Sequence, residues 1–463
     1  MTEYNAERIV QARHLEGMTQ RELSERSHIS QSKLSKLQNG FIVFKENEAR
    51  AIAAALGFPM AYFTREDPIL PMTAVTYRKT SKSSMGELAA VSIEYSELCA
   101  TVSRLAGLLG MPAGKPAWIR DIASHKTDLS GSEIDSIANR ARTCMGLDPI
   151  GPVGNLTRSL ERQGIVVAPM KTTGGSDDGK TRLTSEGITY PQYEGMPCIG
   201  YSAGKRIGGD RQRFTKAHEL GHLILHRFRR PDTPQQMERE AHLFAGALLL
   251  PAEDMSRSIR RNATLSDFLK VKSGWGVSIA ASISRARTLD IISAERYRSL
   301  QIQLSSRGWR KQEPVNVGEE HPLLLKQMIQ AVFGVGSSIG GEQAISSFDA
   351  AGKLAIPFRY LDCWSDGLVE EGMEFRLRRG PNRIGRQRPC PSWHGTGSAF
   401  PSAECDRPAS PWGCIAWVGT RRGLFRKTYE DMHSMVDNSS LLSLLTVLKP
   451  GGSFRIGMDP GWP

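Results

Sequence analysis

One apolar stretch, residues 213–227 (RFTKAHELGHLILHR), holds two histidines four residues apart, with a glutamate directly after the first. Residues four apart lie one turn apart on the same helix face, so His218 and His222 can share one tetrahedral metal ion. Glu219 can reach the water that such an ion activates without being a ligand, as a general base must. Gly221 would let a strand or a substrate backbone approach. The spacing therefore predicts a metal-dependent hydrolase, and the alternative is a pair of hydrogen-bonded core histidines.

A site of this kind needs a third protein ligand. His226 lies eight residues from His218, about 12 Å along one helix, which is too far for both to bind one ion at bonds of about 2 Å. The next predicted helix, about residues 235–250, offers Glu238 and Glu240. Periodicity alone does not choose between these two glutamates. We expect a structural role for His226, with assistance to the oxyanion as the alternative.

A second segment, residues 18–40 (MTQRELSERSHISQSKLSKLQNG), carries two helix start signals. Thr19 and Glu22 have the spacing of a capping box, and Ser30 can cap the helix that follows. Asn39 and Gly40 close that helix, because both residues tolerate left-handed backbone angles. With further helical patterns at residues 5–15 and 46–56, the first 65 residues predict a small all-α unit.

Composition sets the class of protein. The 463 residues are too many for one core of usual size, so two to four domains are expected. The net charge of +12 favours nucleic acid as a partner. No apolar run approaches the ~20 residues of a membrane span, and the N-terminus lacks the pattern of a signal peptide. The seven cysteines are odd in number and scattered, which argues against a disulfide framework. We therefore expect a cytoplasmic protein with no membrane contact.

The runs GDRQRFTKAHELGHLILHR and EREAHLFAGALLLP resemble the ImmA/IrrE family of zinc metallo-endopeptidases. In that family a helix of pattern E-x-E/Q-A-N/D-x-F-A-x-x-L-L-x-P follows the H-E-x-x-H helix, and its first glutamate supplies the third ligand. The resemblance thus implies a Zn²⁺ site of His218, His222 and Glu238, with Glu219 as the catalytic base. His242 stands where the family usually has Asn or Asp, which concerns the surroundings of the ligands.

Residues 6–63 resemble the helix-turn-helix of the phage-repressor (XRE) family. The resemblance implies that residues 30–38 lie in the major groove of duplex DNA. The residues that would contact DNA are Gln31, Ser32, Lys33 and Lys36 on this helix, and Gln20 and Arg21 near phosphates. His28 departs from the family, which usually has a small residue in this turn. The alternative is a helical interaction module without a DNA role.

We expect a multidomain chain in which an all-α helix-turn-helix domain precedes an α+β zincin-like metallopeptidase domain. The expected parts are the helix-turn-helix domain at 1–65, a linker at 66–84, the peptidase domain at 85–260, a helical extension at 261–345 and a tail at 346–463. Strands are predicted at 164–169 (GIVVAP) and 196–202 (MPCIGYS). The tail shows no period of 2 or 3.6 beyond about residue 361, so we expect it to be irregular or disordered.

These patterns predict a DNA-binding regulator fused to a zinc-dependent endopeptidase. As the resemblance implies, its substrate would be a protein such as a transcriptional repressor. The alternative is a transcriptional regulator whose zinc site is structural or sensory. Glu219 favours the enzyme, because a structural site needs no free glutamate base. The sequence does not set the oligomeric state, and a dimer is compatible with it.

Overall fold

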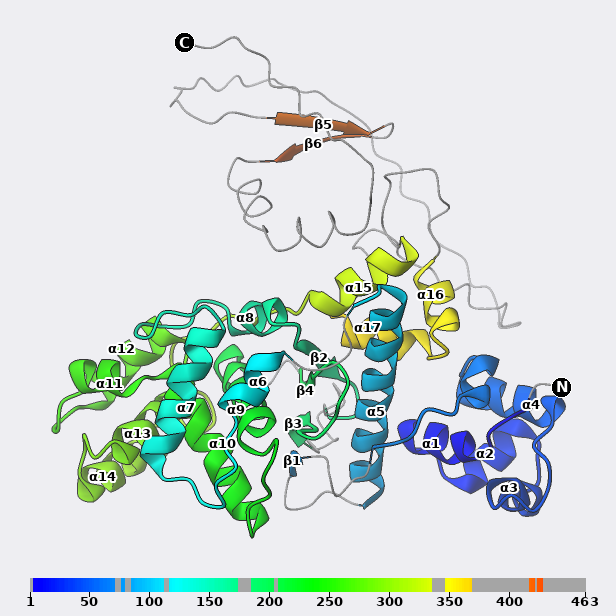
Figure 1. Cartoon of the computed structure of the whole chain (residues 1–463), viewed down its shortest axis with the longest axis horizontal. Coiled ribbons are helices and arrows are strands. Elements are labelled where there is room, and N and C mark those ends of the chain that lie inside the picture. Colours follow the sequence, from blue (N-terminus) through cyan, green and yellow to red (C-terminus); the bar gives the residue numbers. More distant parts are fainter. Residues whose placement is uncertain are drawn as a thin grey trace, which may run out of the picture. The chain divides into compact units, whose positions relative to one another are not determined.

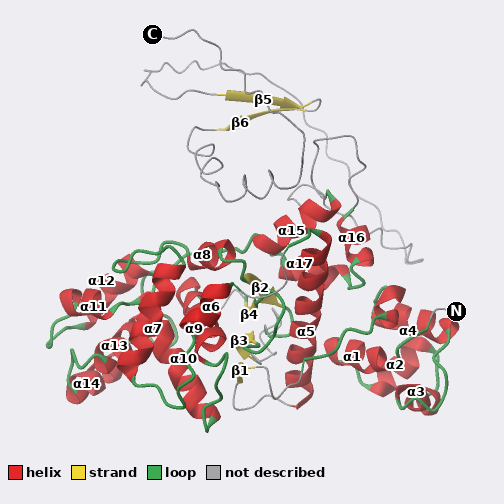
Figure 2. Ribbon diagram, viewed as in Figure 1, coloured by secondary structure: helices red, strands yellow, loops and turns green. Residues whose placement is uncertain are grey.

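The computed structural model describes residues 3–70, 76–79, 85–111, 116–173, 185–203, 207–334, 346–368, 416–420 and 423–427. They fall into two compact units, Met1–Glu374 and Phe375–Pro463 (Figures 1 and 2). In the second unit, β5 (Ala416–Thr420) and β6 (Gly423–Lys427) pair as antiparallel strands. The remainder of the predicted tail beyond residue 368 lies outside the described residues. No described helix is long and apolar enough to cross a membrane.

The first unit begins with the predicted helical domain, which consists of α1 (Glu7–Leu15), α2 (Gln20–Ser27), α3 (Gln31–Gln38), α4 (Glu46–Leu56) and the 3₁₀ helix η1 (Met60–Thr64). Both predicted caps are present: Thr19 and Glu22 form a capping box, and the Ser30 side chain accepts from the Lys33 amide. His28 takes up the left-handed turn between α2 and α3 with φ of 57°. This explains why a small residue is usual there, because such angles strain most side chains.

The long helix α5 (Met85–Leu108) stands between this domain and the sheet (Figure 1). Most of its side chains are buried, and it packs against α1 on one side and the sheet strands on the other. A single apolar cluster runs from Leu23 and Leu34 of the helical domain through Val91 of α5 to Val166 of the sheet. The helical domain therefore shares its core with α5 and does not stand apart on a linker.

Four strands form the sheet in the order β1-β3-β4-β2. They are β1 (Thr76–Lys79), β2 (Val166–Met170), β3 (Ser185–Thr189) and β4 (Cys198–Ser202). Strands β2 and β4 pair in parallel, and the other two pairs are antiparallel. β2 and β4 are the two strands that the sequence predicts, whereas β1 falls in the predicted linker. Adjacent residues of β2 point into two different apolar cores. Val166 belongs to the core shared with α5 and the helical domain, and Val167 belongs to a second core on the opposite face of the sheet.

Helices surround the second core on the other face of the sheet. They are α6 (Ala117–Ile122), α7 (Gly131–Cys144), α8 (Leu156–Arg162), α9 (Gly209–Leu225), α10 (Pro234–Leu249), α11 (Ala252–Ser258), α12 (Leu265–Trp275), α13 (Ile279–Thr288) and α14 (Ala294–Ser306). α9 lies between the sheet and α10, and α10 packs in turn on α7. This position buries nearly the whole of α9, including the two histidines of the H-E-x-x-H motif.

Residues 346–368, which we expected to belong to the irregular tail, form two short packed helices. These are α16 (Ser347–Lys353) and α17 (Phe358–Trp364), and α15 (Leu324–Phe333) precedes them. Trp364 is fully buried, and its indole N–H donates to Glu94 at 2.9 Å. The Tyr360 hydroxyl donates to the Leu15 carbonyl at 3.0 Å. A helix of seven residues is too short to show a clear period, so the sequence pattern could not reveal this packing.

Candidate metal centre and nucleic-acid interface

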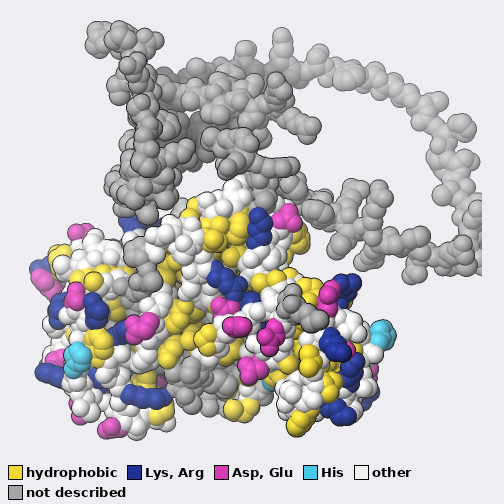
Figure 3. All heavy atoms as spheres, turned by 45° about the vertical axis from the view of Figure 1, so that its right-hand side comes forward, with side chains coloured by type: hydrophobic (Ala, Val, Ile, Leu, Met, Phe, Trp, Pro, Cys, Tyr) yellow, Lys and Arg dark blue, Asp and Glu magenta, His cyan; other side chains and the backbone are white. Residues whose placement is uncertain are grey.

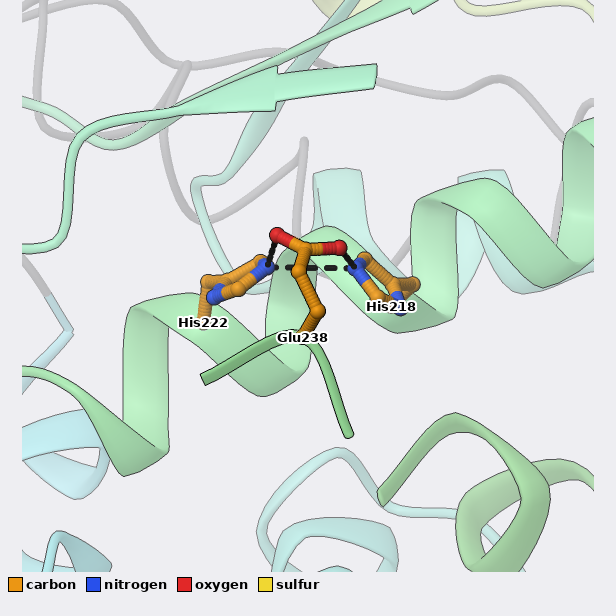
Figure 4. Close-up of side chains that lie close together, drawn as sticks. All are labelled: His218, His222 and Glu238. Carbon is orange, nitrogen blue, oxygen red and sulfur yellow. Dashed lines mark hydrogen bonds and ion pairs between the residues drawn. The ribbon is translucent and has the colours of Figure 1, made fainter. Parts of the chain in front are cut away.

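α9 and α10 bring together three side chains that could hold a metal ion, His218, His222 and Glu238 (Figure 4). The two histidine Nε2 atoms are 3.1 Å apart, and each lies 3.3–3.4 Å from one oxygen of the Glu238 carboxylate. Two ligands of a tetrahedral zinc ion, at bonds of about 2.0–2.1 Å, are about 3.3 Å apart. The donor atoms therefore have the mutual distances that one shared ion requires.

The close packing of α10 on α9 sets this arrangement. A Cβ on Gly221 would come within 3.0 Å of Phe244 and 3.2 Å of the Ala241 backbone. Gly221 thus admits the neighbouring helix, and our expectation that it admits a strand or a substrate is wrong. The Thr233 side chain caps the N-terminus of α10, and Pro234 occupies its first position. Glu238 then projects toward the histidines from the second turn of α10.

Glu219 directly follows His218 in the sequence and is buried beside the strand β3. A Cβ on Gly187 would lie 2.5 Å from Glu219 Oε1 and 2.7 Å from the Thr215 methyl group. Only glycine lets β3 run this close to the carboxylate. Gly187 is not among the residues predicted from the sequence, although a glycine within a strand often marks such a close approach.

A second set of buried polar groups contacts His222 at Nδ1, the ring nitrogen that does not face His218 and Glu238. His222 Nδ1 lies 2.9 Å from His226 Nδ1, and His226 Nε2 lies 3.2 Å from Glu240. Arg229 donates to both oxygens of Glu240, at 2.5 and 3.1 Å. Glu240, the ligand candidate that periodicity could not exclude, therefore belongs to this second set, while Glu238 faces the two histidines.

Burial and hydrogen bonding give the second set a defined charge. Burial lowers the pKa of His226 to about 4, although Glu240 opposes this shift. Burial alone would raise the pKa of Glu240, but hydrogen bonds from His226 and Arg229 hold it at about 2. At neutral pH, therefore, His222 contacts the neutral imidazole of His226. That imidazole in turn contacts the ionised carboxylate of Glu240, which is paired with Arg229.

The predicted DNA-contacting residues lie on α2 and α3 of the helical domain. Four exposed side chains lie along α3: Gln31, Ser32, Lys33 and Lys36. At the start of α2, Gln20 donates to the Gln31 carbonyl at 3.2 Å, and Arg21 pairs with Glu25 at 3.0 Å. Lys33 also pairs with Glu48 at 2.7 Å, so part of its charge is neutralised within the domain. Dark blue Lys and Arg side chains gather at the lower right of Figure 3, over this domain.

Two family models match the chain. Residues 6–61 match a model described as a helix-turn-helix domain, and residues 160–286 match the peptidase M78 model, described as an IrrE N-terminal-like domain. The second match extends from α8 to α13 and includes every residue of the candidate metal centre. No curated protein matches the sequence.

In chain order, the residues that match the helix-turn-helix model precede a mixed α/β region built on the four-stranded sheet. The match to the IrrE N-terminal-like peptidase M78 model falls within that region. The predicted family resemblance and multidomain fold class are confirmed.

Proposed function

We propose that this protein is a DNA-binding regulator that also acts as a zinc-dependent endopeptidase. The observation that carries the proposal is the convergence of two imidazoles and one carboxylate beside the buried carboxylate of Glu219. A donor set of two histidines and one glutamate is characteristic of catalytic zinc, which keeps a fourth position open. A structural zinc site has four protein ligands instead. The described residues group only these three side chains.

The side chains have distinct roles in this proposal. Zinc bound to His218, His222 and Glu238 would act as a Lewis acid and lower the pKa of water at its open position to about 7. Glu219 accepts a proton from the attacking water and delivers it to the leaving amine. His226 and Glu240 keep the ring of His222 turned so that its Nε2 faces His218 and Glu238. β3, held against Glu219 at Gly187, fixes the carboxylate in place.

The proposed substrate is a protein, such as a transcriptional repressor that acts on the same operator. Cells that produce the wild-type chain should contain new protein N-termini that are absent from cells producing the Glu219→Gln variant. Mass spectrometry of labelled N-termini in the two cultures measures this difference. Identical sets of N-termini would contradict the peptidase proposal and leave a regulator with a structural or sensory metal site.

Replacement of Glu238 by alanine is expected to remove most of the bound zinc. Three protein ligands are the minimum for such a site, so the loss of one removes much of the affinity. Metal content per chain, measured by mass spectrometry after gel filtration, should fall from about one to near zero. Glu253→Ala, at an exposed glutamate of α11, is the matched control and should retain zinc. Full occupancy in Glu238→Ala would exclude Glu238 as a ligand.

Replacement of Lys36 by glutamine is expected to weaken DNA binding and to make the affinity for DNA less dependent on salt concentration. Lys36 is exposed on α3, and no described carboxylate pairs with it. A lysine that contacts one phosphate contributes about 0.9 to the slope of log K against log salt concentration. Titration of the full chain with duplex DNA from its own promoter region should show this decrease in slope. Lys270→Gln, at an exposed lysine of α12, should leave the slope unchanged, and an unchanged slope for Lys36→Gln would exclude the phosphate contact.

A further inference from the structure

A cavity of about 1260 Å³ lies beside the candidate metal centre. α9 and α10 form one wall, and the other wall comes from α12, α13, α14 and residues 309–316. The second wall lies largely beyond residue 286, where the match to the peptidase model ends. The cavity therefore lies between helices inside the matched region and a segment beyond it.

The cavity begins one helical turn from the proposed zinc ligands. Phe214 lies four residues before His218 on α9, and His242 lies four residues after Glu238 on α10. The ring centroids of Phe214 and His242 are 4.9 Å apart, and both residues line the cavity. Because one turn of helix rises about 5.4 Å, a polypeptide with its scissile bond at the metal centre reaches this cavity within a few residues.

The carboxylates that line the cavity already have partners. Glu186 pairs with Arg211. Asp210 and Glu313 both pair with the buried Lys272, at 2.8 and 3.0 Å. Glu313 also accepts the amide N–H groups of Ile279 and Ala280 at the start of α13, where the helix dipole favours negative charge.

Two cations at the other side of the cavity have no such partner. Arg310 and Lys311 are exposed, and within the described part of the chain neither forms an ion pair with a carboxylate. Neutral groups hold the Arg310 side chain, since it donates to Ser305 Oγ at 2.5 Å and to Gln301 Oε1 at 2.7 Å. The half-buried Trp309 beside them adds an aromatic surface to the same wall. The wall thus offers uncompensated positive charge next to an apolar ring.

We propose that this cavity binds a segment of the protein substrate that carries aspartate or glutamate a few residues from the scissile bond. Arg310 and Lys311 contact its carboxylates, because charge-assisted hydrogen bonds to carboxylate are stronger than neutral ones. Arg310 and Lys311 are then specificity-determining residues of the peptidase. This inference rests on the proposed function, which supplies the scissile bond.

Peptide retention on the full chain tests the inference. A peptide library prepared from a digested bacterial proteome is passed over immobilised Glu219→Gln protein, and retained peptides are identified by mass spectrometry. We expect enrichment of Asp- and Glu-containing peptides, and a decrease of about tenfold in that enrichment when Arg310→Glu and Lys311→Glu are added. Arg260→Glu with Arg261→Glu is the matched control, because these exposed arginines lie outside the cavity lining. The control makes the same change in net charge and should keep the enrichment.

Two results would overturn the inference. One is an equal loss of enrichment in both charge-reversal pairs, which indicates attraction to the basic chain as a whole. The other is retention without preference for acidic peptides. Cleavage of the same library by the wild-type chain is scored separately. Absence of cleavage with acidic retention intact contradicts the proposed peptidase activity, whereas cleavage without acidic preference contradicts the cavity inference alone.

Discussion

The Glu219→Gln variant is expected to bind zinc as the wild-type chain does but to cleave its substrate about 10²–10⁴ times more slowly, the usual effect of removing a general base. Glutamine has nearly the same shape, so it fits the space between α9 and the Gly187 backbone. The substitution leaves His218, His222 and Glu238 unchanged. It removes the only carboxylate that the H-E-x-x-H motif provides for proton transfer.

Initial cleavage rates and metal content, measured on the same preparations, check this prediction. Glu253→Gln is the control for a loss of negative charge, because Glu253 is exposed on α11. It should match the wild type in both measurements. A Glu219→Gln protein that cleaves at the wild-type rate would show that Glu219 is not the base. A variant that loses its zinc would instead assign Glu219 a role in metal binding.

The Glu97→Ala variant is expected to lose about 3–5 kcal/mol of folding free energy, the usual effect of breaking a buried ion pair. Glu97 on α5 is buried and receives Arg8 of α1 and Arg65, each at 2.5 Å. The Tyr62 hydroxyl donates to the same carboxylate at 3.2 Å. Truncation leaves two buried guanidinium groups without this partner. Their remaining carboxylate partner, Asp67, is only partly buried, and their other acceptors are backbone carbonyls.

Urea unfolding, followed by circular dichroism, measures the change in stability. Glu46→Ala removes an exposed glutamate that pairs with Arg50 four residues away. This control should shift the free energy of unfolding by no more than about 0.5 kcal/mol. A Glu97→Ala protein as stable as the control would mean that the helical domain does not depend on α5 for its stability.

Features with a local cause could be predicted from the sequence. The caps at Thr19 and Ser30 form within one helical turn, so their residue types and spacing determine them. The same holds for His218 and His222, because four residues of helix place them on one face. The helix-turn-helix and the first two groups of the candidate metal centre therefore follow from short segments.

Features that depend on packing between distant segments could not be predicted in this way. Glu238 and Glu240 both occur on α10, and the rotation of that helix on α9 decides which one faces the histidines. That rotation depends on Gly221 and Phe244, which meet across the two helices. Likewise Arg8 and Glu97 are 89 residues apart, and the sequence around neither residue indicates a buried ion pair. The burial of Trp364 could not be predicted either, because this residue lies on a seven-residue helix and packs against the distant helix α5.

The dependence of cleavage on zinc, measured on one preparation of the protein, decides whether this chain is a zinc peptidase. The purified chain is stripped with a chelator, reloaded with increasing zinc and incubated with the proteome-derived peptide library, and new peptide termini are counted by mass spectrometry. We expect cleavage to disappear on stripping and to return in proportion to zinc up to about one ion per chain. Glu219→Gln should show no cleavage at any zinc level. Cleavage that survives stripping, or zinc-loaded wild type that cleaves no more than Glu219→Gln, would contradict the proposal of a zinc peptidase.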